Sequence, residues 1–453
     1  MSARGPFLRT WLALVVLAGL GAYIYFVESK REPGSEKKKE KVFSLDKAKV
    51  GALTLRPRAA EEIRLVKDQD KGWRMAAPRE VPADSGAVDS IVSALESLEV
   101  EDAVGDKPAS LAEFGLEKPR MTVEATEQGG RSVSLLLGDK VPAGSGVYAK
   151  LPSSPRVFTI AGYLDGTFDK KAFDLRDRDV LHVKRDEIQG LEVTGPEGSY
   201  VLAKDSAGEW SFRKPLATRA GRWSVDGLLG ALEGLRMESV AAEEPKDLKP
   251  FGLDKPQRTV TAVLATGVRR TLEIGSSPSD KKYNARDAAG GPVVVVASGL
   301  VDDLAKGMDS LRDKRLGDVA AYDVEGFEAV IDGAARAYAK TTAKGKDGVE
   351  TQTWKRTSPD PKELETDKVQ DALFKVGGLE AQSFVDAPGP DASYGLDKPE
   401  LKLSVRKPSS KTPLVLELGR KDGAVYGRRS GDASILKLDP AKAEELVKAL
   451  KEL

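Results

Sequence analysis

The sequence contains Phe114-Gly115-Leu116-Glu117-Lys118-Pro119 and repeats it as Phe251-Gly252-Leu253-Asp254-Lys255-Pro256 and Tyr394-Gly395-Leu396-Asp397-Lys398-Pro399. The three copies share one pattern: aromatic, glycine, leucine, acid, lysine, proline. A tryptophan precedes the copies by 41, 41 and 40 residues, at Trp73, Trp210 and Trp354. This constant spacing indicates that a whole folding unit occurs three times.

A helix is predicted between each tryptophan and its motif. Each tryptophan is followed five residues later by a proline, and an apolar set at offsets 0, 3, 4, 7 and 10 begins ten residues after that proline. These offsets describe one face of an amphipathic helix. The prolines are Pro78, Pro215 and Pro359, and the sets are Val88, Ile91, Val92, Leu95 and Leu98; Val225, Leu228, Leu229, Leu232 and Leu235; and Val369, Ala372, Leu373, Val376 and Leu379. The predicted N-caps are Asp84, Ser224 and Thr366.

After each motif the apolar period changes to two, as half-buried strands require. Met121, Val123 and Ala125 show this alternation, as do Leu401, Leu403 and Val405, while Arg258 interrupts it in the second copy. Further strand-like runs are residues 135–138, 272–275 and 414–419, each ending in glycine, and residues 157–160, 293–296 and 435–438. Two more precede the tryptophans, such as 191–193 and 200–202. The predicted fold class is α+β, with strands, one helix, more strands and a closing helix on largely antiparallel sheets.

The spacing between motifs, 137 and 143 residues, exceeds the about 20–50 residues of solenoid repeats, so each copy should have its own core. We predict three tandem domains over residues 42–179, 180–317 and 318–453, after an anchor and charged tether over residues 1–41. The tripeptides Leu175-Arg176-Asp177 and Leu311-Arg312-Asp313 end the first two copies and are interpreted as connectors.

Composition favours a folded body and gives no sign of nucleic-acid binding. The chain has 71 basic and 71 acidic residues, so no general attraction to a polyanion follows. The one basic cluster, Lys37-Lys38-Lys39 with Lys41, is interleaved with acids and is interpreted mainly as a solvated tether, with contact to anionic lipid headgroups as the alternative.

Residues 10–27 are uncharged and mostly apolar. As a helix, this segment nearly spans a hydrocarbon core of about 30 Å. A cleaved signal peptide is the alternative, but its best site, Gly19-Leu20-Gly21, would leave an apolar new terminus at Ala22. An uncleaved, single-pass transmembrane anchor is therefore predicted.

The orientation of this anchor is open to two interpretations. Six basic residues soon after the segment against two before it would keep the body in the cytoplasm under the positive-inside rule. A long downstream domain can be translocated regardless of charge, and the absence of cysteine fits an oxidising exterior. We predict a bacterial cytoplasmic (inner) membrane protein with its body on the periplasmic side.

The tryptophan–proline step, the repeated Gly-Leu-acid-Lys-Pro motif, the downstream Leu-Gly and the Tyr-x-Lys/Arg segments resemble the bacterial domain-of-unknown-function family 4340 over residues 42–453. Members are often encoded beside ABC transporters of the gliding-motility type. The resemblance therefore implies an auxiliary protein with a protein partner, an ABC transporter permease. It supplies no catalytic residues.

The sequence assigns no catalytic, cofactor-binding or metal-binding residue. One histidine and no cysteine exclude thiol catalysis and multi-histidine or thiolate zinc sites. His182 is interpreted as structural, and Gly144–Lys150 as a hairpin because it lacks the Gly-Lys-Ser/Thr ending of a phosphate loop. Hydrolysis by a pair of carboxylates needs no motif and stays open.

The repeated motif has a structural and a functional interpretation. Structurally, glycine permits a positive φ, leucine anchors the turn and proline directs the next strand. Functionally, Phe114, Phe251 and Tyr394 would present three copies of a site. A second candidate surface combines Tyr148, Tyr283 and Tyr426 with Lys150, Arg286 and Arg428.

Two functions follow. The first is a membrane-anchored, non-enzymatic extracytoplasmic scaffold or accessory protein, auxiliary to an ABC transporter. The second is an extracytoplasmic glycan- or peptide-binding protein with carboxylate-based hydrolase activity. A cleft lined by acids and aromatics would favour the second function, and closed domains with an apolar patch would favour the first.

Overall fold

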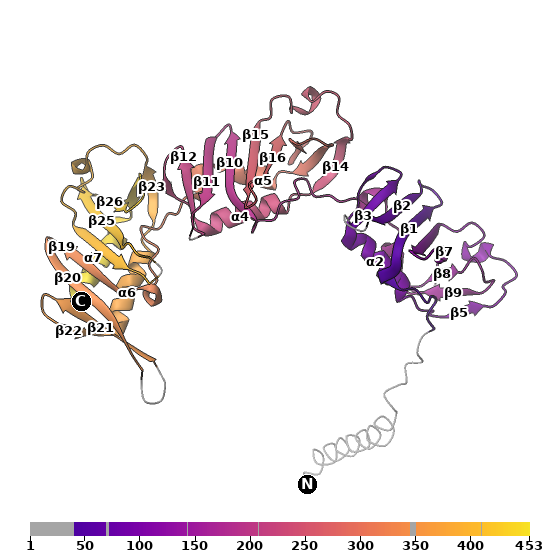
Figure 1. Cartoon of the computed structure of the whole chain (residues 1–453), viewed down its shortest axis with the longest axis horizontal. Coiled ribbons are helices and arrows are strands. Elements are labelled where there is room, and N and C mark those ends of the chain that lie inside the picture. The colour runs from indigo at the N-terminus through magenta and orange to yellow at the C-terminus, as the bar shows by residue number, and fades with distance from the viewer. Residues whose placement is uncertain (1–39, 69–71, 143, 207, 345–349, 409) are drawn as a thin grey trace, which may run out of the picture. The chain divides into compact units, whose positions relative to one another are not determined.

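The structure is a computed structural model that describes residues 40–68, 72–142, 144–206, 208–344, 350–408 and 410–453. Within them are three nine-stranded antiparallel sheets (Figure 1). We call each sheet with its helices a module. The predicted α+β class and the three tandem repeats are confirmed.

Module 1 consists of β1 (Val50–Pro57), β2 (Ile63–Asp68), β3 (Gly72–Ala77), β4 (Val81–Pro82), α2 (Ser85–Glu96), β5 (Ala103–Gly105), β6 (Met121–Glu127), β7 (Ser132–Lys140), β8 (Val147–Lys150), β9 (Val157–Ile160) and α3 (Leu164–Phe168). Module 2 consists of β10 (Ile188–Gly195), β11 (Gly198–Lys204), β12 (Trp210–Lys214), β13 (Thr218–Arg219), α4 (Arg222–Glu233), β14 (Met237–Ala242), β15 (Arg258–Leu264), β16 (Arg269–Ile274), β17 (Lys282–Asp287), β18 (Val293–Ala297) and α5 (Gly299–Ala305). Module 3 consists of β19 (Gly326–Ile331), β20 (Ala334–Lys344), β21 (Glu350–Ser358), β22 (Lys362–Leu364), α6 (Thr366–Gly377), β23 (Ala381–Val385), β24 (Leu401–Arg406), β25 (Leu414–Lys421), β26 (Ala424–Arg429), β27 (Ile435–Leu438) and α7 (Pro440–Glu452).

The strand order is the same in each module. In module 1 it is β4-β3-β2-β1-β6-β7-β8-β9-β5, so α2 connects the two edge strands and passes across one face of the sheet. The predicted apolar sets of α2, α4 and α6 are buried against the corresponding face of each sheet. Trp73 is also buried there and donates from its indole N–H to Asp89 of α2 at 2.8 Å. The prolines that follow the three tryptophans each have a cis peptide bond.

Only one of the three predicted N-caps is correct. The Asp84 carboxylate accepts a hydrogen bond from the Ala87 N–H at 3.0 Å, as a cap does. Helix α4 instead begins at Arg222 after Gly221, and α6 begins at Thr366 after Glu365. Gly221 lies next to the connector, where a β-carbon would be 3.2 Å from the Arg312 carbonyl oxygen. Close backbone packing therefore takes precedence over a capping side chain at that position.

The chain divides into two compact units, Met1–Arg178 with module 1 and Asp179–Leu453 with modules 2 and 3. The three sheets lie inside the predicted ranges 42–179, 180–317 and 318–453. The exact domain boundaries stay predictions, above all the one at 317/318, which falls inside the second unit.

The connector arginine of the second unit has internal partners. Arg312 is 2% exposed. Its guanidinium donates to the Asp386 carboxylate at 2.7 Å and to the Ser434 hydroxyl at 2.6 Å, and it lies 3.6 Å from the centre of the Phe384 ring. These contacts support the interpretation of the repeated tripeptide as a connector.

No helix among the described residues is long and apolar enough to cross a membrane. The predicted anchor at residues 10–27 and the basic cluster at residues 37–39 lie outside the described residues.

The close backbone approach between the motif turn and the sheet generates a prediction for Gly275→Ala. A β-carbon at Gly275 would be 2.1 Å from the Phe251 carbonyl oxygen, so the motif turn must move away from the sheet. We expect module 2 to be destabilised by about 1–3 kcal/mol, as in other overpacked sites. Native-state hydrogen exchange of the β15–β17 amides in the full chain measures the change.

Gly227→Ala is the matched control in the same module. Gly227 lies in α4, and a β-carbon added there would have nothing within 4 Å, so alanine should leave stability unchanged or raise it by up to about 1 kcal/mol. Equal protection in the two variants would show that the close approach has no energetic weight.

Candidate functional site

The repeated motif forms a turn that lies on the sheet. A short 3₁₀ helix, Ala112–Phe114 in module 1, ends at Gly115 with φ of 66°, and Gly252 and Gly395 have φ of 66° and 68°. The leucines that follow, Leu116, Leu253 and Leu396, are 2–3% exposed, whereas the acid and lysine of each motif are exposed. The geometry is that of the structural interpretation.

The glycines that end the downstream runs explain why the turn lies where it does. A β-carbon at Gly138, Gly275 or Gly419 would be 2.0, 2.1 or 2.4 Å from the carbonyl oxygen of the motif aromatic. Only glycine lets the two backbones approach this closely. Leu116 packs against Gly138 on the side of the sheet away from the cluster of helix-facing residues.

In two modules, the motif aromatic and the downstream tyrosine contact each other, so the two predicted candidate surfaces coincide there. Phe114 and Tyr148 form an edge-to-face pair with ring centres 5.0 Å apart, and Tyr394 and Tyr426 form one at 5.1 Å. All four side chains are half-buried. These pairs join the turn to the sheet, as such aromatic pairs commonly do.

The cations of the Tyr-x-Lys/Arg segments are engaged within their own modules. Lys150 is 8% exposed and donates to the Leu151 carbonyl, and Arg286 pairs with Glu273 at 3.1 Å. Arg428 contacts both carboxylate oxygens of Asp391, at 2.8 and 2.9 Å, and Glu417 at 2.7 Å. Burial alone would lower the pKa of Arg428, but Glu417 and Asp391 outweigh it and raise that pKa. The structure therefore uses these cations as internal partners.

The single histidine contributes to neither surface. His182 is exposed and has a positive φ of 52° at the start of the second unit. Within the described ranges, no group of three or more potential metal ligands comes together.

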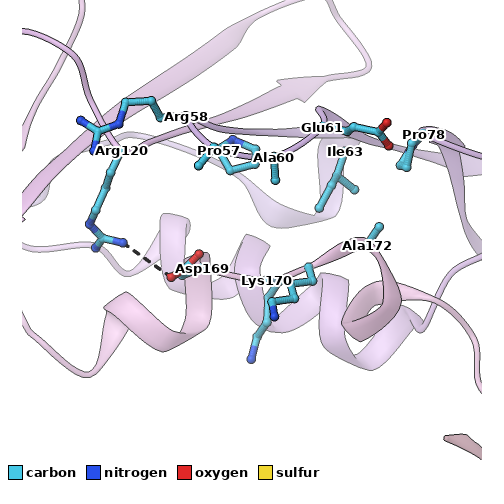
Figure 2. Close-up of a pocket in the computed structure, with 12 residues that line it drawn as sticks. Pro57, Arg58, Ala60, Glu61, Ile63, Pro78, Arg120, Asp169, Lys170 and Ala172 are labelled. Atoms are coloured by element: carbon cyan, nitrogen blue, oxygen red, sulfur yellow. Dashed lines mark ion pairs between the residues drawn. The ribbon is translucent and has the colours of Figure 1, made fainter. Parts of the chain in front are cut away.

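A pocket of about 580 Å³ lies in module 1. It lies between the β1–β2 turn and the segment that follows α3 (Figure 2). Four cationic side chains line it, Arg58, Arg120, Lys170 and Lys171, with the carboxylates of Glu61 and Asp169 and an apolar part that includes Pro57, Ile63 and Pro78. The sequence patterns identified none of these residues as a site residue. Pro78 was noted only as a proline of the repeat.

Arg120 is fixed at one end of the pocket. Its Nε donates to the Gly138 carbonyl at 2.8 Å, and its Nη2 pairs with Asp165, a carboxylate that Lys140 also approaches at 3.2 Å. Asp169 lies 3.7 Å from the Arg120 Nη1. Arg120 immediately follows the first motif, so the turn positions it.

The pocket lies where the β1–β2 ladder stops early. Pairing ends at Leu55 with Ile63, which leaves residues 56–62 outside the β1–β2 ladder. The corresponding hairpin of module 2 continues to Gly195 with Gly198, and that of module 3 to Ile331 with Ala334. Pro57 occupies the place of Gly195 and Ile331, and proline has no N–H to donate to a ladder.

The hairpins of the other modules carry charged pairs. In module 2, Glu197 of the two-residue hairpin pairs with Arg258, which is 9% exposed and interrupts the apolar alternation. In module 3, Asp332 of the hairpin pairs with Lys451 of α7 at 2.7 Å. Module 1 has Met121 at the position of Arg258. The sequence could have indicated this site through the differences between the three copies at the positions of Pro57 and Met121.

A family model described as "Domain of unknown function (DUF4340)" matches residues 73–222 and 210–399. Each match begins at a repeat tryptophan and ends in the following module. The boundaries of the family model therefore differ from the boundaries of the sheets. No curated protein gives a significant match.

Some solved structures align with the chain at low similarity. A DNA polymerase III subunit beta from Pseudomonas aeruginosa is 10% identical, with 88% of this chain and 94% of that chain covered and a TM-score of 0.16. A DNA polymerase sliding clamp from Pseudomonas aeruginosa with ligand is 9% identical, with 87% and 92% covered and a TM-score of 0.17. Scores this low carry no argument about fold or function.

The structural role of the Tyr-x-Lys/Arg cations predicts the effect of Arg428→Met. The change removes the link between Asp391, where the third motif turn begins, and Glu417 in β25. We expect module 3 to lose about 1–3 kcal/mol, since a partly buried carboxylate loses a charged partner. Hydrogen exchange of the β24–β26 amides measures this loss.

Arg269→Met in module 2 is the control for Arg428→Met. Arg269 also pairs with a carboxylate, Glu192, but both side chains are at least 41% exposed, so the change should leave the stability of module 2 nearly unchanged. If Arg428→Met leaves hydrogen exchange in module 3 unchanged, Arg428 has no structural role there and a ligand-binding role would be favoured instead.

Proposed function

The chain belongs to the DUF4340 family, a domain of unknown function, and on that premise we propose that it is a membrane-anchored, non-enzymatic scaffold or accessory protein outside the cytoplasm. Its three modules bind protein partners. The proposed partner is an ABC transporter permease, supported by the resemblance that the repeated motifs carry. The membrane anchor is the apolar segment at residues 10–27.

One observation carries the scaffold function: every module exposes a large aromatic side chain at a position that the other modules do not share. Tyr163 of module 1 is 79% exposed, Trp223 of module 2 is 82% exposed, and Phe374 of module 3 is 76% exposed. At the place of Trp223, the other modules have Gly86 and Asp367. Aromatic side chains are enriched where proteins bind each other.

The residues shared by the modules have a different use. The repeated glycines, leucines and aromatics hold the motif turn on its own sheet. A chain that repeats its framework and varies its exposed aromatics offers three different contact surfaces. This arrangement suits a scaffold better than a triplicated catalytic site.

The pocket of module 1 supports a second candidate, the binding of a peptide or another small ligand. Its carboxylates, Glu61 and Asp169, are outnumbered by four cationic side chains, and no aromatic residue lines it among the described residues. The pocket therefore gives better support to ligand binding than to glycan recognition or hydrolysis by paired carboxylates.

Photocrosslinking from native membranes tests the scaffold function. We expect a photoreactive amino acid at Trp223 or Phe374 to crosslink to a membrane protein, an ABC permease, because these positions are exposed and aromatic. The control position is Glu363 in β22, whose side chain is 82% exposed and polar. The same products from all three positions, or no membrane protein product, would contradict the proposal.

Protease accessibility tests the location independently. In spheroplasts of cells with an intact inner membrane, we expect added protease to digest all three modules, because the body lies on the periplasmic side. A cytoplasmic marker protein in the same sample controls for membrane integrity. Full protection of the modules until detergent is added would place them in the cytoplasm.

A further inference from the structure

Three cationic side chains of the module 1 pocket have no carboxylate partner in the described part of the chain. The guanidinium of Arg58 donates to the Lys118 carbonyl at 3.1 Å. Within the described ranges, Lys170 and Lys171 form no ion pair through their ammonium groups. Lys170 is half-buried, and Lys171 is exposed. These three side chains therefore bring positive charge to the pocket that no ion pair among the described residues neutralises.

The lysine of module 2 that corresponds to Lys170 has a carboxylate partner. Aligning Leu164 with Leu300 and Leu175 with Leu311 places Lys170 at the position of Lys306. The Lys306 ammonium pairs with Asp303 at 2.6 Å. Module 1 has Thr167 at the position of Asp303. The same lysine is thus neutralised in one module and available in the other.

The pocket also has two chemically different ends. In Figure 2, Arg58, Arg120 and Asp169 lie toward one end, and Lys170 lies between the ends. The apolar side chains of Ile63, Pro78 and Ala172 lie toward the other end, together with the carboxylate of Glu61. Its volume of about 580 Å³ is within the range of small-molecule sites. With four cations against two carboxylates, the lining favours an anion over a cation or a neutral molecule.

We propose that this pocket binds a small organic anion. Its carboxylate or phosphate is attracted by the cations Arg58, Lys170 and Lys171, and its apolar part lies against Ile63, Pro78 and Ala172. Asp165 and the Gly138 carbonyl hold the guanidinium of Arg120 in place. Arg120 therefore serves to position the charged end of the ligand and not as an unpaired cation. Charge-assisted hydrogen bonds from such cations to an oxyanion are stronger than those between neutral groups. This proposal does not depend on the membrane anchor or on a transporter partner.

Calorimetric titration of the full chain in lipid nanodiscs tests the proposal with four soluble probes. Benzyl phosphate and phenylacetate share a ring and differ in the oxyanion, benzyl alcohol is the neutral probe, and inorganic phosphate lacks the apolar part. We expect saturable binding of at least one of the first two, and affinity at least tenfold lower for benzyl alcohol and inorganic phosphate. The stronger of the first two probes identifies the oxyanion.

Two variants locate the binding in module 1. Lys170→Gln with Lys171→Gln removes two of the cations, and Thr167→Asp gives Lys170 the partner that Lys306 has in module 2. We expect each variant to weaken binding of the preferred probe by about tenfold or more, because each lowers the positive charge of the pocket. Lys306→Gln is the matched control and should bind like the unmodified chain.

Several results would overturn the proposal. These are no saturable binding of either organic anion at millimolar concentration, equal binding of benzyl alcohol, or unchanged affinity in both module 1 variants. Equal affinity for inorganic phosphate would remove the role assigned to the apolar end. Hydrogen exchange of β1 and β2 confirms that a variant with weakened binding is still folded.

Discussion

The close approach between the motif turn and a glycine of the sheet is the constraint on which each module depends. In module 1 the Phe114 carbonyl oxygen occupies the space that a side chain at residue 138 would need. That approach requires glycine in the strand, a positive φ at Gly115 and an anchoring leucine next to it. The helices cover one face of the sheet, and the turn covers part of the other. The three repeated residues are therefore parts of one contact.

The repeated framework could be predicted from the sequence because it rests on periodicity and on backbone geometry. Offsets of three and four residues identified the helix faces, and all of those residues are buried. The alternation after each motif identified strands that pair in the same order three times. The cap at Gly221 was not predictable in this way. Its identity depends on a contact with Arg312, a residue far away in the sequence.

The candidate site could not be predicted from the repeated pattern, because it results from what one copy lacks. The pattern draws attention to shared residues, and these serve the framework. The pocket depends on Pro57, which stops a ladder that modules 2 and 3 continue, and on Met121, which stands where module 2 has Arg258. Each of these differences is ordinary in isolation. Their joint effect appears only when the turn, the strand and the segment after α3 are placed together.

The loss of neutralising partners is a simple physical route from a structural module to a binding module. In module 2, Glu197 of the hairpin pairs with Arg258, and Asp303 neutralises Lys306. Module 1 keeps the lysine but has neither the inward-facing arginine nor the aspartate. Lysines that still reach water can lack a partner at little cost in folding free energy, since exposed ion pairs contribute only about 0–1 kcal/mol. The motif turn that packs on Gly138 leads directly into Arg120, which donates to the Gly138 carbonyl. The position of Arg120 is therefore fixed by the framework, while the other residues that line the pocket differ between modules. A module of this kind can change its ligand chemistry through a few surface positions without altering the contact that holds it together.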